Sequence, residues 1–249
     1  MELFADIMLI TGIAGIAGTG LGGLSGIIFK RGGKKGSGFM LGFAGGVMLS
    51  VVCFDLIPQA LLLSHIMLVL SGTALGFCAV FLLNSLTCRI SAVYGNSAGR
   101  SGSLITGGAV TAVAIALHNL PEGMVIGSSF VPAGAAHAGG LAIAAVMGLH
   151  NIPEGMAVAL QLTEGGMKKT AAVLLTALAG APTVAGAAFG FMVGNINPLW
   201  LSLSLSAASG AMLYVVFGEL PASVNGSASG LPAFAVLAGI LTGILMTVF

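Results

Sequence analysis

Two short blocks of the sequence contain the residues best suited to chemistry. Residues 117–124 read LHNLPEGM, and residues 149–156 read LHNIPEGM. Each block places a histidine and a glutamate four positions apart, so in a helix both side chains leave the same face. Two such faces turned toward each other would bring two imidazoles and two carboxylates together. The sequence therefore predicts a divalent metal site with four candidate ligands: His118, Glu122, His150 and Glu154.

The chemistry of this ligand set narrows the choice of metal. Nitrogen and carboxylate oxygen together suit zinc, iron(II), manganese, cobalt or cadmium, and the blocks lack the thiolates that favour copper(I). Two carboxylates would balance the double charge of the ion. Asn119 and Asn151 follow the histidines by one position, which turns them about 100° around the helix. They are predicted either to help hold a second ion or to donate hydrogen bonds around the first.

The segments that carry these blocks are predicted to be membrane helices. The chain has 249 residues, of which 57% are hydrophobic and 6% charged, whereas soluble domains carry about 25% charged residues. A spanning helix needs about 20 mainly apolar residues. Eight segments qualify, at 4–28, 38–58, 64–86, 103–128, 138–161, 168–193, 199–221 and 231–249. The predicted fold class is an all-α integral membrane protein with eight transmembrane helices in a single domain, residues 1–249.

The placement of the charges predicts an orientation. All eight basic residues lie in or beside three of the seven loops (joints) between the predicted helices, at 30–35, 89–100 and 168–169. These are alternate joints, so they share one side, which the positive-inside rule makes cytoplasmic. Both termini are then predicted on the outer side. Glu2 and Asp6 stand where a cleavable signal would carry positive charge, so the first segment is predicted to be retained. The three cysteines show no CxxC spacing and predict neither a disulfide framework nor a zinc ribbon.

A second internal similarity relates two further segments. Residues 46–52 read GVMLSVV and residues 210–216 read GAMLYVV, and the same register pairs Asp55 with Glu219. The two segments are predicted to run in opposite directions, and repeats of opposite topology are typical of secondary transporters with a site near the bilayer midplane. Asp55 and Glu219 are predicted to be the acids at which an ion enters and leaves. The alternative is that each is an acid near the membrane surface whose side chain extends (snorkels) to the polar interface.

The HNLPEG and HNIPEG blocks resemble the metal-binding motifs of the ZIP (Zrt-/Irt-like) family of metal-ion transporters, particularly its compact bacterial members. The resemblance implies a 3+2+3 inverted-repeat bundle in the bacterial inner membrane, with both termini outside. It further implies import of divalent metal as substrate, zinc first, by a homodimer in lipid, without catalytic cofactor or nucleic acid. By this resemblance His118, Glu122, His150 and Glu154 form the main site, and Asn119 and Asn151 match positions that help hold a second ion.

The sequence departs from the family pattern in two places. Some relatives carry an acid just before a proline in the sixth helix, where this chain has Ala181 and Pro182. A full two-ion centre is therefore not expected. The loop after the third helix, residues 89–103, contains no histidine. The histidine-rich loop of many eukaryotic members is thus absent.

Two other classes of protein were weighed against a transporter. An intramembrane zinc-dependent hydrolase needs three protein ligands, an open position for water and a general base. Histidine and glutamate are present, but the chain has no HExxH block, and an inverted repeat has no evident use in hydrolysis. A metal sensor or structural metal site would not need alternating access. The sequence therefore predicts a metal transporter and no enzyme.

Overall fold

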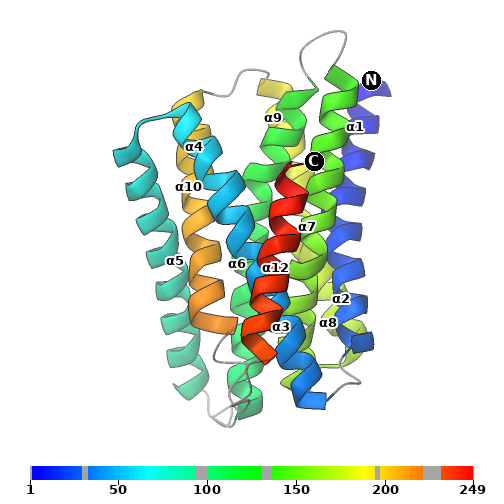
Figure 1. Ribbon diagram of the computed structural model, residues 1–249, viewed down its shortest axis with the longest axis vertical. Helices are drawn as coiled ribbons and strands as arrows, with labels where there is room; N and C mark the ends of the chain where they lie inside the picture. Colours follow the sequence, from blue (N-terminus) through cyan, green and yellow to red (C-terminus); the bar gives the residue numbers. More distant parts are fainter. Residues whose placement is uncertain are drawn as a thin grey trace.

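The computed structural model describes residues 2–29, 33–93, 100–130, 136–193, 197–220 and 231–248. Over these ranges the chain forms a bundle of long helices, and no strand occurs in them. The helices lie close to parallel or antiparallel, as Figure 1 shows. The predicted all-α class is confirmed for these residues.

The spans follow the predicted order. The first span consists of α1 (Glu2–Gly12), η1 (Ile13–Ala17) and α2 (Gly18–Phe29). The second consists of α3 (Gly33–Val51), η3 (Val52–Leu56) and α4 (Ile57–Leu63), and the third is α5 (Ile66–Val93). Two long central helices follow, α6 (Arg100–Ser129) and α7 (Ala136–Glu164). The last are α8 (Lys169–Ala179) with α9 (Pro182–Val193), α10 (Pro198–Tyr214) with η4 (Val215–Glu219), and α12 (Leu231–Val248).

Seven stretches of the described residues are long and apolar enough to cross a membrane. The apolar part of α12, Ala233–Met246, is shorter. Several helices run past the predicted bounds: the second span covers 33–63 instead of 38–58, and α5 extends to Val93 instead of ending at 86. Glycine, proline and asparagine between the apolar segments predict turns at 32–35, 95–96, 132–134, 164–166 and 225–226. The first prediction is wrong at Gly33, which begins α3. The turn at 164–166 is confirmed, with Gly166 at a φ of 99°, and the turns at 95–96, 132–134 and 225–226 lie outside the described residues.

The interruptions of the helical pattern differ from those predicted. A proline inside a helix removes one hydrogen bond and usually kinks the helix, so the sequence predicts kinks at Pro121 and Pro153. However, α6 and α7 continue as α-helix through both prolines. Interruptions occur instead in neighbouring spans, as the π-helical turns η1, η3 and η4. Between α8 and α9, Pro182 has no N–H to continue the helical pattern. The flanking amides of Gly180, Ala181 and Thr183 bond carbonyls three residues back.

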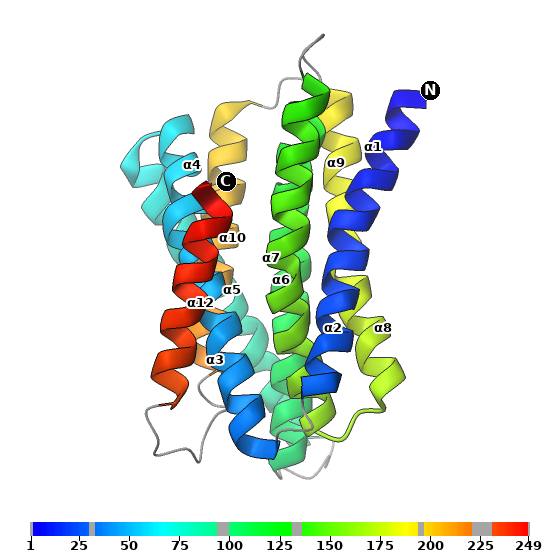
Figure 2. The same ribbon diagram turned by 45° about the vertical axis from the view of Figure 1, so that its right-hand side comes forward.

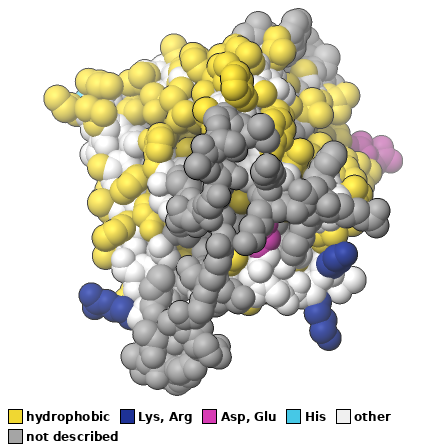
Figure 3. Space-filling model, turned by 60° about the horizontal axis from the view of Figure 1, so that its bottom comes forward, with side chains coloured by type: hydrophobic (Ala, Val, Ile, Leu, Met, Phe, Trp, Pro, Cys, Tyr) yellow, Lys and Arg dark blue, Asp and Glu magenta, His cyan; other side chains and the backbone are white. Residues whose placement is uncertain are grey.

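The outside of the bundle is apolar and the inside holds polar groups. Large side chains such as Leu62, Met192 and Phe234 are 87%, 76% and 71% exposed, whereas His118, Asn119 and Glu122 are 0% exposed. The interior also contains a large apolar core, so the apolar outer surface is what distinguishes the bundle from a soluble protein, as expected where lipid surrounds it. Figure 3 shows hydrophobic side chains over the flank and Lys and Arg side chains toward the end that comes forward. The described chain is a multi-pass membrane protein.

The helices pack in matching pairs around α6 and α7. The most extensive contacts join α2 with α7 and α6 with α9, and likewise α3 with α12 and α5 with α10. Figure 2 shows α6 and α7 in the middle, with α1, α2, α8 and α9 on one side and α3, α4, α5, α10 and α12 on the other.

Glycines bring several of these backbones into contact. A Cβ at Gly155 would meet the backbone of Thr19, and a Cβ at Gly123 would meet the backbone of Thr183. Small residues permit this approach in membrane bundles, where lipid supplies no hydrophobic incentive for helices to associate. Both metal-motif helices are thus held against a flanking span.

Candidate metal centre

The four predicted ligands lie in the middle of the two central helices. His118 and Glu122 are one turn apart on α6, and His150 and Glu154 are one turn apart on α7. The residues share a helix face because 3.6 residues complete one turn. All four are buried, with exposed fractions of 0–1%. The predicted spacing therefore does bring the two blocks together.

The contacts within the cluster centre on Glu122. Its Oε1 lies 2.8 Å from Nε2 of His118 in the same helix and 2.8 Å from Nε2 of His150 in α7. Ligand atoms of these three residues all lie within 4.8 Å of one another. Oε1 of Glu154 lies 3.3 Å from Nε2 of His118. Each helix thus contributes one histidine and one glutamate to the contacts between α6 and α7. The centroids of the two imidazole rings are 6.2 Å apart.

Several polar atoms of the cluster have no hydrogen-bond partner in the described structure. They are Nδ1 of His118, Oε2 of Glu122 and Oε2 of Glu154. Among the described residues, Nε2 of His118 and Oε1 of Glu154 make only the ion-pair contacts given above. Buried polar groups without partners are costly and are rare in folded proteins. Two carboxylates enclosed at low dielectric also need compensating positive charge. A divalent cation would supply both the missing partner and the missing charge.

Asn119 and Asn151 tie the central helices to the flanking spans. Nδ2 of Asn119 donates to the carbonyl of Ala179, and Nδ2 of Asn151 donates to the carbonyl of Ala14, each over 3.0 Å. Ala14 lies in η1, and Ala179 ends α8 before Pro182. Oδ1 of both asparagines has no hydrogen-bond partner in the described residues. The amide nitrogens therefore bond backbone carbonyls of the flanking spans, and the amide oxygens have no partner among the described residues.

The tie between Asn151 and Ala14 leads to a stability prediction. Asn151→Ala should lower the free energy of unfolding by about 1–3 kcal/mol, because the carbonyl of Ala14 would stay buried without its donor. Thermal unfolding in detergent, followed by circular dichroism, measures the change. Thr176→Val is the matched control, since the buried Thr176 hydroxyl bonds the carbonyl of Ala172 in its own helix. Equal melting of both variants would show that the tie contributes nothing.

The predicted acids outside the cluster are placed differently from one another. Asp55 lies in η3, is half-buried, and accepts a hydrogen bond from Nε2 of Gln59. Its carboxylate is within electrostatic reach of His150, Glu122 and His118. Glu219 is the last residue of η4, so both acids stand in π-helical turns. Such turns occur often at functional sites, and nothing in the local sequence indicates them.

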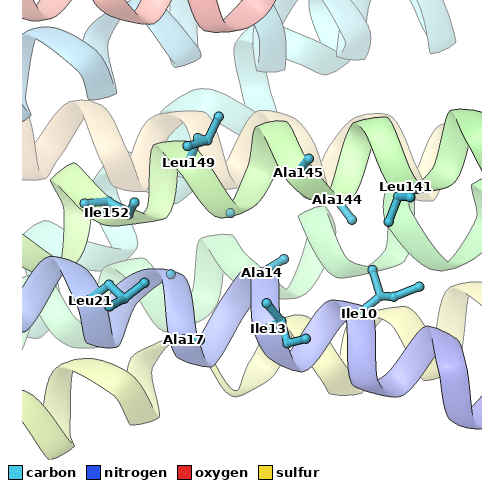
Figure 4. Close-up of a pocket in the computed structure, with 12 residues that line it drawn as sticks. Ile10, Ile13, Ala14, Ala17, Leu21, Leu141, Ala144, Ala145, Leu149 and Ile152 are labelled. Carbon is cyan, nitrogen blue, oxygen red and sulfur yellow. The ribbon is translucent and has the colours of Figure 1, made fainter.

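An apolar pocket lies beside the cluster but is separate from it. It has a volume of about 490 Å³ and lies between the first span and α7, where Ile10, Ile13, Leu21, Leu141, Leu149 and Ile152 contribute to its lining. Figure 4 shows these side chains from the two helices on either side of the space. None of the four candidate ligands lines it. Its lining consists of apolar side chains and glycines.

The comparison with known families agrees with this site. A family model described as ZIP zinc transporter matches residues 94–249, more than half of the chain and inclusive of both motif blocks. The match leaves out the first three spans, whereas the 3+2+3 bundle that the resemblance implies includes them. None of the curated proteins compared with the chain matches it. The buried histidine–glutamate cluster lies within the matched region, and the chain belongs to the ZIP zinc transporter family.

Proposed function

We propose that this chain imports divalent transition-metal ions into the cytoplasm, with zinc foremost and iron(II), manganese, cobalt and cadmium as further substrates. Membership of the ZIP family supports transport of a divalent metal in general. The observation that carries the proposal is the buried cluster on α6 and α7 with its unpartnered ligand atoms. A transporter family also fits a protein that is no enzyme and needs no catalytic cofactor.

In this proposal four side chains bind the ion in transit. His118, Glu122 and His150 supply the ligand atoms that already lie within 4.8 Å of one another. Glu154 completes the set, with its Oε1 3.3 Å from Nε2 of His118. The oxygens of Asn119 and Asn151 extend the set toward a neighbouring position. Ala181 supplies no carboxylate there, so we infer that a second ion binds more weakly than the first.

We further propose that eight spans form a 3+2+3 inverted repeat in one domain, residues 1–249. The matched pairs of helix contacts and the two equivalent asparagine ties support this symmetry. Rigid-body movement of one helix group against the other would expose the site to each side in turn. Figure 1 places both chain ends in the upper half of the molecule. With the basic joints inside, both termini face outward from a bacterial inner membrane.

Asp55 and Glu219 are proposed as the acids at which the ion enters and leaves. They stand on spans of opposite direction, so they lie on opposite sides of the cluster in the proposed orientation. The functional unit is proposed to be a homodimer in lipid, as the family resemblance implies. No nucleic acid takes part.

The test is zinc flux into proteoliposomes that contain an indicator for free zinc. The intact protein should show saturable flux, and the double variant His118→Ala/Glu154→Ala should lose at least about 100-fold. Even residues outside the ligand shell of a metal site typically contribute 10–100-fold to affinity or activity. Competition by iron(II), manganese, cobalt and cadmium then ranks the substrates.

Two outcomes would contradict the proposal. Flux retained in the double variant would show that the ion bypasses the cluster. Tight zinc binding by the intact protein without any flux would point instead to the alternatives, an intramembrane zinc-dependent hydrolase or a metal sensor. The same preparation would then be assayed for hydrolysis.

A further inference from the structure

A second polar pair joins α6 to α7 on the side of the cluster toward the basic joints. Oγ1 of Thr111 donates to Oε1 of Gln161 over 3.0 Å, and both residues are 0% exposed. Nε2 of Gln161 has no hydrogen-bond partner in the described structure. A buried amide that is only half satisfied is costly. The oxygens of the pair, and not this donor nitrogen, are the atoms that could face a cation.

The pair continues the register of the metal cluster. Along the line where α6 and α7 face each other, here called the seam, contacts join Glu122 to His150 and His118 to Glu154. Seven residues further back along α6 is Thr111, and seven residues further along α7 is Gln161. Seven residues are close to two full turns of a helix, so the pair lies on the same faces of α6 and α7 as the cluster. A rise of about 1.5 Å per residue puts the pair about 10.5 Å from the cluster along the helices.

The surroundings of the pair are apolar and closed. The layer between the pair and the cluster consists of Ala114, Ile115, Ala157 and Val158, all at most 2% exposed. An ion that leaves the cluster along this seam would cross that one layer and then meet the oxygens of Thr111 and Gln161. One turn beyond the pair, the same register reaches Gly107 and Gly165, which carry no side chains to block the way.

The similarity between the two histidine–glutamate blocks does not by itself account for this pair. The shift of 32 positions that relates His118 to His150 relates Thr111 to Ile143, and it relates Ser129 to Gln161. Ile143 is apolar, and the Ser129 hydroxyl donates to the carbonyl of Ile126 in its own helix. The polar connection is therefore specific to one side of the cluster. In the proposed orientation that is the cytoplasmic side.

We propose that Thr111 and Gln161 form an inner binding position for the divalent cation between the His/Glu cluster and the cytoplasm. Amide and hydroxyl oxygens are suitable but weak ligands for such a cation, which allows the ion to pass on. Their mutual hydrogen bond closes the seam when no ion passes. This inference rests on the proposed transport function and assigns its exit step.

The experiment compares zinc flux and equilibrium zinc binding in Gln161→Leu and the intact protein. Gln161→Leu keeps the side-chain size and removes the amide, so turnover should fall about tenfold while zinc affinity of the cluster stays within about twofold. Thr111→Val, which removes only the hydroxyl, should lower turnover about threefold with the same unchanged affinity. Thr176→Val is the control and should transport like the intact protein, because its hydroxyl bonds only its own helix among the contacts described.

The outcomes separate this inference from the transport proposal. Absence of flux in the intact protein would overturn the transport proposal, and this inference with it, before any variant is compared. Normal turnover in Gln161→Leu, or in Thr111→Val should Gln161→Leu fail to fold, would overturn the inner position alone. Parallel loss of zinc affinity and turnover would also overturn it, because Gln161 would then support the cluster and not the exit.

Discussion

Glu122→Gln is expected to abolish zinc uptake, with a loss of at least about 100-fold. Glu122 is the residue whose carboxylate lies 2.8 Å from both imidazoles, so it connects the candidate ligands of the two helices. Glutamine keeps the shape of the side chain but removes the negative charge that would balance the ion. Zinc flux into proteoliposomes and the rise in melting temperature on zinc addition measure the effect. Both should disappear together, because a ligand stabilises a protein only in proportion to its binding.

The variant should still fold and insert. Without zinc, the Glu122 carboxylate contacts both imidazoles, so its loss should lower the melting temperature of the metal-free protein. Glu164→Gln is the matched control, because Glu164 is the last residue of α7 and lies outside the cluster. It should transport normally. Uptake by Glu122→Gln at the intact rate would show that Glu122 is no ligand.

Gly155→Ala is expected to destabilise the bundle by about 1–3 kcal/mol or to prevent folding. The added Cβ would meet the backbone oxygen, carbon and Cα of Thr19, and backbone cannot turn aside as a flexible side chain can. Overpacking of this kind typically costs about 1–3 kcal/mol. It would push α2 away from α7 next to Glu154, so zinc affinity should fall as well. Thermal unfolding in detergent with and without zinc measures both effects.

A second glycine supplies the comparison. A Cβ at Gly12 would lie 3.8 Å from Cγ2 of Val184, an ordinary contact distance. Gly12→Ala should therefore be neutral or stabilise by up to about 1 kcal/mol, because alanine favours helix over glycine. If both variants melt at the same temperature, close backbone contact between α2 and α7 does not hold the site helices.

Local patterns in the sequence sufficed to predict the class of the protein and the four histidine and glutamate residues of the candidate site. Long apolar runs with few charges predict membrane helices because backbone groups in lipid must bond within their own segment. Spacing of four residues puts His118 beside Glu122, and His150 beside Glu154, in any helix. The sequence also predicted that the two blocks would meet.

Other local predictions failed because a neighbouring span changed the outcome. Pro121 and Pro153 were expected to interrupt their helices, and α6 and α7 run through both. The irregular turns lie in the flanking spans instead, where a carbonyl of η1 accepts from Asn151 and the carbonyl of Ala179 accepts from Asn119. The apolar sequence of residues 13–17 gives no indication of the π-helical turn η1.

The sequence by itself determined that this is a helical membrane protein with two equivalent histidine–glutamate faces, because hydropathy and helical spacing are local properties of the chain. Only the tertiary structure decided how those faces meet. Contact of Glu122 with both imidazoles, the Asn151 bond to Ala14 across 137 positions, and the Thr111–Gln161 pair all depend on the register between separate helices. That register is set by glycine backbones in contact and by long-range hydrogen bonds, which no single segment encodes.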